Sequence, residues 1–129
     1  MKQEDSSRLL RIMRECADAI PKTLAEKVDP KHTAIIVVDM QNDFCHEEGV
    51  SAKRGMETRL FREVTPKLAE FLAQARRFHP LIVFIRTLYN EWSISPVCLQ
   101  QQMRFPEHLR CFPREDTWGA DLYGVSPQE

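Results

Sequence analysis

Two short runs of apolar residues stand out along the chain, Ala34–Val38 and Leu81–Ile85. Both are rich in β-branched side chains, and neither contains a polar residue. Such unbroken runs are typical of strands buried on both faces of a sheet. The pattern therefore predicts two buried strands, the first of which stops abruptly at a carboxylate, Asp39.

Helical spacing of apolar positions fills the segment between the two runs. It predicts a short helix over residues 57–64 and a longer one with Thr65 as N-cap and Pro66 as first residue, ending at His79-Pro80. The buried stripe of the longer helix would be Leu68, Phe71, Leu72, Ala75 and Phe78. A strand, helix, strand unit over residues 34–85 requires a parallel strand pair with a right-handed crossover. The predicted fold class is therefore α/β.

The residues before this unit form a separate amphipathic segment. Apolar positions over residues 6–20 recur at helical spacing, with Ser6 or Ser7 as N-cap and Pro21 ending the helix. A charged connector follows, with a further helical turn at residues 24–28. We expect residues 1–31 to be an N-terminal helical extension and residues 32–129 to be the domain. The extension is either a contact arm for another subunit or a helix packed on its own domain, and the pattern favours the second.

The remaining segments are less regular. Residues 49–56 are predicted to be loop, and prolines interrupt the weak helical pattern of residues 93–113.

Charge and cysteine content exclude several classes of protein. Eighteen lysines and arginines against nineteen aspartates and glutamates give a formal net charge of −1, so no basic groove for nucleic acid is expected. The four cysteines show no paired spacing, which argues against a zinc ribbon or a disulfide framework. The polar N-terminus and short apolar runs predict a soluble, cytoplasmic protein without a membrane partner.

Asp39 is the strongest candidate for chemistry. In open parallel α/β sheets, ligands bind outside the carboxyl ends of the strands, which places Asp39 at the mouth of a site. Asp43 is expected to be a turn-forming carboxylate that accepts backbone N–H bonds. A magnesium pair of Asp39 and Asp43 is a weaker alternative, and His46 lacks the spacing of a metal ligand. No metal and no other cofactor is therefore expected.

The run Ile-Ile-Val-Val-Asp-Met-Gln-Asn-Asp-Phe, at residues 35–44, resembles the first strand and loop of the isochorismatase-like cysteine hydrolases. This superfamily includes isochorismatases, nicotinamidases and N-carbamoyl amide hydrolases. The segment from Thr117 to Gln128 resembles the same superfamily. The resemblance implies an αβα sandwich, Rossmann-like, around a mainly parallel sheet, and family members often form oligomers.

The resemblance also implies a catalytic triad of Asp, Lys and Cys, in which Asp39 would be the general base. The triad Lys and Cys would lie on later strands and helices. No lysine follows Lys67 in this sequence, so the domain is expected to be C-terminally incomplete and the chain inactive alone. Cys45 is not at the nucleophile position, and its acidic neighbours would raise its pKa.

Aromatic residues near the strand ends are candidates for the wall of a substrate pocket: Phe44, Tyr89 and Trp92. The segment after the second strand lacks the Asp-x-His element of metal-dependent relatives. A small amide, ureido or N-carbamoyl compound, or an isochorismate-type vinyl ether, is therefore the expected substrate class.

The sequence leaves two functions open. The first is a cysteine hydrolase that uses Asp39. The second is a truncated, non-catalytic module that binds a full-length relative or another protein, because two strands alone would leave an open sheet edge. A magnesium-dependent phosphatase is a weaker third alternative.

Overall fold

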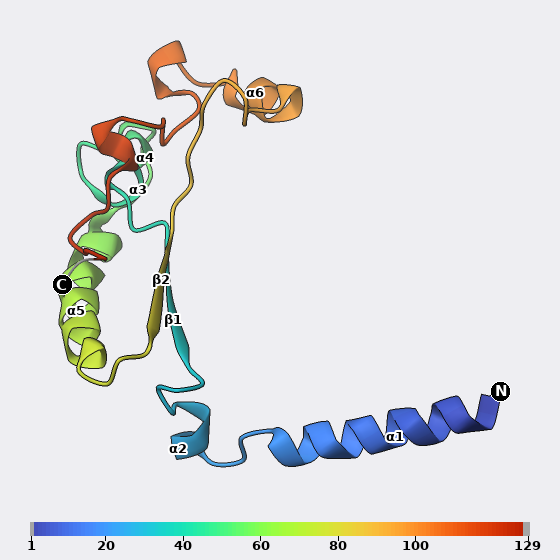
Figure 1. Ribbon diagram of the computed structural model, residues 1–129. Coiled ribbons are helices and arrows are strands. Elements are labelled where there is room, and N and C mark those ends of the chain that lie inside the picture. The colour runs from blue at the N-terminus through green and yellow to red at the C-terminus, as the bar shows by residue number, and fades with distance from the viewer. Residues whose placement is uncertain (1, 128–129) are drawn as a thin grey trace. The chain divides into compact units, whose positions relative to one another are not determined.

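The computed structural model describes residues 2–127 and divides the chain into two compact units, Met1–Thr33 and Ala34–Glu129. Figure 1 labels their helices and strands. In the part of the chain that is described, no helix is both long enough and apolar enough to cross a bilayer.

The first unit contains two helices, α1 (Lys2–Ala19) and α2 (Leu24–Lys27). The predicted N-cap of the first helix is wrong, because α1 begins at Lys2, upstream of both serines. Lysine, glutamine and glutamate are good helix formers, so the residues before Ser6 extend the helix. The predicted helical turn after the connector is confirmed as α2.

A capping box fixes the start of α2. Thr23 Oγ1 accepts a hydrogen bond from the Glu26 N–H at 3.2 Å, and the Glu26 carboxylate accepts one from the Thr23 N–H at 3.1 Å. The Lys22 N–H also donates to this carboxylate, and these backbone bonds, that of Lys22 first, lower the pKa of Glu26. The reciprocal bonds satisfy N–H groups that a helix start leaves unpaired.

The second unit is built on a parallel strand pair, β1 (Ala34–Val38) and β2 (Leu81–Ile85). The register pairs Ala34 with Leu81 and Val38 with Ile85. Both predicted strands and their parallel pairing are confirmed, and the fold is of the α/β class. The carboxyl ends of β1 and β2 therefore lie side by side. Ligand sites of open parallel sheets lie outside these strand ends, and Asp39 follows the end of β1.

A single long helix, α5 (Arg59–Arg76), connects the two strands. The prediction of two helices divided at Thr65 was wrong, because Pro66 lies inside α5. Thr65 does not cap a helix; its hydroxyl donates to the Phe61 carbonyl, one turn earlier, at 2.7 Å. Proline lacks the backbone N–H that would donate to the carbonyl one turn earlier, so α5 continues through Pro66 with that hydrogen bond missing.

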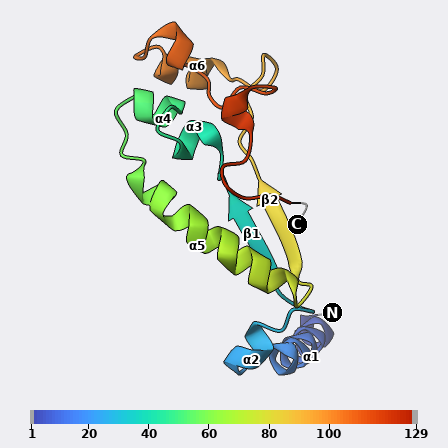
Figure 2. The ribbon, with the colours of Figure 1, turned by 90° about the vertical axis from the view of Figure 1, so that its left-hand side faces the viewer.

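One face of the sheet packs against α5, which runs alongside both strands (Figure 2). Val37, Met40, Cys45 and Leu72 form the buried core, and Ile35, Leu68, Ile82 and Phe84 pack around it. The predicted stripe of α5 is correct at Leu72 but wrong at Phe71 and Phe78, which are exposed. Phe71 lies on another face of α5 than Leu72, and Phe78 follows the end of the helix, which stops at Arg76 and not at His79-Pro80 as predicted.

The prediction that both strands are buried on both faces was also wrong. Burial alternates along β1, with Val37 buried and Ile36 and Val38 more than half exposed. On β2, Leu81 and Ile85 are exposed. Within the described residues a helix covers one face of the sheet, so the second helical layer of a sandwich is not part of this arrangement.

Short helices make up most of the remainder: α3 (Asn42–Cys45), α4 (Val50–Lys53), α6 (Pro96–Gln102), and the 3-10 turns η1 (Glu107–Leu109) and η2 (Trp118–Ala120). The segment predicted to be loop over residues 49–56 contains α4. Ser95 caps α6, its side chain accepting the Cys98 N–H at 3.1 Å, and Pro96 occupies the first helical position.

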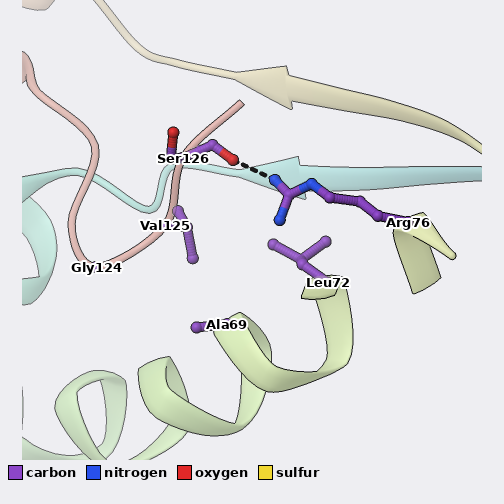
Figure 3. A pocket seen from close by; sticks show the side chains of 6 residues that line it. All are labelled: Ala69, Leu72, Arg76, Gly124, Val125 and Ser126. Atoms are coloured by element: carbon purple, nitrogen blue, oxygen red, sulfur yellow. Dashed lines mark hydrogen bonds between the residues drawn. The ribbon is translucent and has the colours of Figure 1, made fainter. Parts of the chain in front are cut away.

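The segment after η2 returns to the core. The Tyr123 N–H donates to the Met40 carbonyl at 2.8 Å. Figure 3 shows Val125 pointing towards the side of α5 that carries Ala69 and Leu72, around a cavity of about 230 Å³. Arg76 donates to the Ser126 carbonyl beside it. This segment therefore lies across α5 at the end of the described chain.

Candidate active site

Asp39 lies directly after β1 and is held by the end of β2. Its N–H donates to the Ile85 carbonyl at 3.0 Å, and its Oδ1 accepts a hydrogen bond from the Thr87 hydroxyl at 2.9 Å. The backbone of Asp39 is left-handed, with φ of 55°. Residues other than glycine adopt this conformation uncommonly, and strained backbone is concentrated at functional sites. The side chain is half-buried, so it is both fixed and reachable.

Gln41 joins three separate segments at this end of the sheet. Its side-chain amide is fully buried; its Nε2 donates to the Thr87 and Ala120 carbonyls at 3.0 and 2.9 Å, and its Oε1 accepts the Thr87 N–H at 2.8 Å. These three bonds use most of the hydrogen-bonding capacity of the amide. Gln41 therefore fixes the position of Thr87 and, through it, the carboxylate of Asp39.

The next two residues of the motif, Asn42 and Asp43, hold the neighbouring turns. Asn42 Nδ2 donates to the Trp118 carbonyl at 2.7 Å, and Asp43 Oδ1 accepts the Val50 N–H at 3.2 Å. The prediction that Asp43 accepts a backbone N–H is thus confirmed. The carboxylates of Asp39 and Asp43 have different partners, so the structure adds no support to a magnesium pair.

Two glycines let the chain approach Asp43 closely. A Cβ at Gly49 would overlap the backbone carbonyls of Asn42 and Asp43, and a Cβ at Gly119 would overlap the Asp43 carboxylate. Both positions therefore require glycine for reasons of space rather than of backbone torsion.

Cys45 is the cysteine closest to Asp39 in sequence, and it is buried. Its sulfur lies 3.9 Å from the Asp39 carbonyl oxygen. Burial raises the pKa of the Cys45 thiol, and the charge of Asp39 raises it further, while the Gln41 backbone opposes the shift. The direction agrees with the prediction, although burial rather than the nearby glutamates is the main cause. A buried thiol that holds its proton is a poor nucleophile.

The three aromatic residues predicted to wall a pocket lie in different settings. Phe44 packs on the core, with its ring centroid 5.5 Å from that of Phe112. Trp92 is 88% exposed, on a turn stabilised by the Asn90 side chain. Tyr89 lines a cavity of about 260 Å³ together with Cys111 and Arg114. The structure does not bring the three rings together, and a role in substrate binding stays a prediction for each.

Arg54 organises the irregular segment beside this cavity. Its guanidinium lies 4.0 Å from the ring centroids of both Phe105 and Phe112, and it donates to Gln102 Oε1 at 2.6 Å and to the Leu109 carbonyl through Nε at 3.0 Å. Burial lowers the pKa of Arg54, with the charge of Arg104 as the next cause. The segment that contains η1 is therefore tied to the end of α4 by one side chain.

His46 has a structural setting. Its Nδ1 accepts the Glu48 N–H at 3.0 Å, and its ring makes T-shaped contacts with those of Trp118 and Tyr123, at centroid distances of 5.0 and 5.7 Å. Among residues 2–127, no three His, Cys, Asp or Glu side chains gather in a group that could hold a metal ion.

Sequence reasoning missed Thr87 and the role of Gln41. A signal was present for Thr87, because it follows the second strand at the same sheet edge as Asp39. The partners of Gln41 lie 46 and 79 residues away, so nothing local in the sequence indicates them.

Comparison with known proteins gives one match. The model of the Isochorismatase domain family matches residues 33–129. No curated protein and no solved structure matches the chain. The matched region begins just before β1 and includes Asp39, Gln41 and Thr87.

Proposed function

The chain belongs to the Isochorismatase domain family, a hydrolase-type family, and from this membership we propose that it is a hydrolase in which Asp39 is the general base. The proposed substrate is a small amide, ureido or N-carbamoyl compound, or an isochorismate-type vinyl ether. The proposed chemistry uses a cysteine nucleophile.

The observation that carries the proposal is the pairing of Asp39 with Thr87. A general base must be held in position and must be accessible to the proton that it accepts. The Thr87 hydroxyl holds one oxygen of Asp39 at 2.9 Å and leaves the second oxygen without a hydrogen bond in the described part of the chain. That second oxygen is the one available for proton transfer.

In this proposal the carboxylate of Asp39 takes the proton of a cysteine thiol, and the thiolate adds to the carbonyl carbon of an amide or ureido substrate. The C–N bond of the tetrahedral adduct then breaks, the leaving nitrogen takes the proton from Asp39, and water hydrolyses the resulting thioester. A lysine balances the negative charge of the site, as the resemblance implies. Cys45 is not that nucleophile, because its side chain is buried and burial raises the pKa of its thiol. The nucleophile and the lysine are therefore proposed to come from residues other than those that surround Asp39 here.

The test is a substrate panel with the protein as its own cell produces it. Ammonia release reports amide and ureido hydrolysis, and pyruvate release reports cleavage of the vinyl ether. We expect turnover of one of these classes and its loss after alkylation with iodoacetamide. A sample given iodoacetamide already quenched by excess thiol is the control. Absence of turnover with every class, or turnover that alkylation leaves intact, would contradict the proposal.

The uncovered face of the sheet favours a second candidate function, a non-catalytic module that binds a full-length relative or another protein. Parallel sheets are normally covered on both faces, yet Ile36, Val38, Leu81 and Ile85 are exposed together on the face away from α5. Such a surface favours association with a partner.

The two candidates differ in what Asp39 does. As a binding module the chain would retain its full association after Asp39→Asn and would lose it after Ile36→Glu, measured by sedimentation with the full-length relative. Unchanged association after Ile36→Glu would exclude the sheet face as the binding surface.

A further inference from the structure

A further cavity, of about 340 Å³, is lined by residues of α3, α4, η2 and the segment of residues 108–114. Its wall includes Asp43, His108, Arg110, Phe112, Arg114 and Trp118. The volume is at the lower end of the range for small-molecule sites, which suits a ligand with a single ring.

The wall carries an excess of positive charge. Arg110 and Arg114 are permanently charged, and the guanidinium of Arg54 lies 4.0 Å from the ring centroid of Phe112, which also lines the cavity. Asp43 is the one carboxylate among the residues that line the cavity, and its Oδ1 already accepts the Val50 N–H. The cavity therefore has a net attraction for anions.

Arg110 and Arg114 are held in different ways. The Arg110 side chain donates to the Phe105 carbonyl at 2.7 Å and to the Met103 carbonyl at 3.3 Å, so it is part of the wall. The backbone of Arg114 is fixed, because it pairs with Tyr89 and its carbonyl accepts the Thr117 hydroxyl at 2.6 Å.

The guanidinium of Arg114 makes no hydrogen bond or ion pair with any residue that the structure describes, and the same holds for the imidazole of His108. A planar guanidinium matches a carboxylate with two parallel hydrogen bonds. Arg114 thus offers a fork of donors on a backbone that is already in place.

Apolar surface completes the cavity. Phe112 and Trp118 line it beside the two arginines, and Val50 adds an aliphatic side chain. Aromatic rings pack well against the flat face of another ring. We propose that this cavity binds a small ring-containing carboxylate, with Arg114 and His108 on the carboxylate and Phe112 and Trp118 on the ring. This binding site is separate from the proposed hydrolysis, because Asp39 is not among the residues that line the cavity. Ligand binding there can therefore be measured without any turnover.

The test is the binding of 4-fluorobenzoate, followed by fluorine NMR and by calorimetry at low ionic strength. Removal of one charged hydrogen-bond partner costs about 1.5–3 kcal/mol, or roughly tenfold to a hundredfold in affinity. We therefore expect Arg114→Gln to weaken binding at least about tenfold and His108→Gln to weaken it less. Both side chains lack described partners, so neither change should alter the fold, which equal urea midpoints would verify.

The matched control is Arg77→Gln, which removes the same charge from the exposed end of α5. It should leave the affinity for 4-fluorobenzoate unchanged. Benzamide, which keeps the ring and lacks the charge, should bind at least about tenfold more weakly than the carboxylate. Inorganic phosphate should displace 4-fluorobenzoate poorly, because it cannot use the aromatic wall.

Three results would overturn the inference. The first is an absence of saturable binding of 4-fluorobenzoate. The second is an equal affinity in the Arg114→Gln and Arg77→Gln variants, which would place the anion elsewhere. The third is displacement of 4-fluorobenzoate by phosphate or by benzamide as efficiently as by benzoate. Efficient displacement by phosphate would mean that the cavity recognises charge alone, and efficient displacement by benzamide would mean that it recognises the ring alone.

Discussion

Replacement of Gly119 by alanine tests the close packing around Asp43, because the packing decides whether the free energy of unfolding falls or rises. Gly119 lies in η2, and its backbone is not left-handed, so alanine meets no torsional strain there. In open space, Gly→Ala at such a position stabilises a protein by about 0.4–1 kcal/mol, because the unfolded chain loses freedom. Any destabilisation must therefore come from contacts.

The structure places such a contact. A Cβ at Gly119 would lie 2.5 Å from Asp43 Oδ1, and nearer still to Oδ2, where ordinary contact begins at 3.4 Å. The carboxylate would have to move by more than about 0.9 Å, because Oδ2 lies nearer than Oδ1, or give up its bond from Val50. Overpacking of this kind costs about 1–3 kcal/mol. We expect Gly119→Ala to lower the free energy of unfolding by that amount.

Urea denaturation followed by circular dichroism measures this change, and an unchanged m-value would show that the stability itself has moved. In an Asp43→Ala background the clash is absent, so Gly119→Ala should become neutral or stabilising, and the double-mutant cycle should show coupling of about 1–3 kcal/mol. A Gly119→Ala variant as stable as its parent, or additive effects in the cycle, would refute the packing argument.

Three further changes test other parts of the account. Arg54→Lys should lower the free energy of unfolding by about 2 kcal/mol, because lysine cannot span Phe105, Phe112 and the Leu109 carbonyl at once, and urea midpoints equal to the parent's would contradict this. The raised pKa of Cys45 means that the folded state holds the thiol proton more tightly than the unfolded state does. The free energy of unfolding should therefore be highest below the unfolded thiol pKa of about 8.5 and should fall as the pH rises above it. Cys45→Ala should flatten this dependence of the free energy of unfolding on pH, and identical slopes in the variant and its parent would argue against a buried thiol. Thr87→Val should lower kcat about tenfold with little change in KM, because it frees the Asp39 carboxylate without touching the substrate, and a change in KM alone would contradict a positioning role.

Much of the framework of the second unit could be predicted from the sequence. The runs that form β1 and β2 are continuous and β-branched, and the helix between them leaves a parallel pair as the simplest arrangement. The position of Asp39 followed from this topology, because a residue after the first strand lies at the carboxyl edge of the sheet.

The failures have physical causes. Pro66 indicated a helix start, yet α5 continues through it, because the loss of one backbone hydrogen bond does not end a helix that extends on both sides of the proline. The strands were expected to be buried on both faces, but burial needs a second layer, and a run of apolar residues does not reveal what covers it.

The residues that complete the candidate sites are the hardest to predict. Gln41 bonds to Thr87 and Ala120, which are far away in sequence, so its role depends on the finished fold. Arg110 and Arg114 lie in an irregular segment without periodicity, and the cavity that they line appears only when α4 and η2 are in place. The local sequence pattern is enough to predict the strands, whereas the candidate sites are formed by contacts between residues far apart in the sequence.

The most direct test of the central claim, that Asp39 is the general base of a hydrolase, is the effect of Asp39→Asn on kcat/KM for the substrate class that the panel identifies. Asparagine keeps the size and the hydrogen bond with Thr87 but cannot accept the proton. Loss of a general base costs about 10²–10⁴ in rate, so we expect kcat/KM to decrease at least about a hundredfold with the urea midpoint little changed. A variant that keeps the parent's kcat/KM would contradict it.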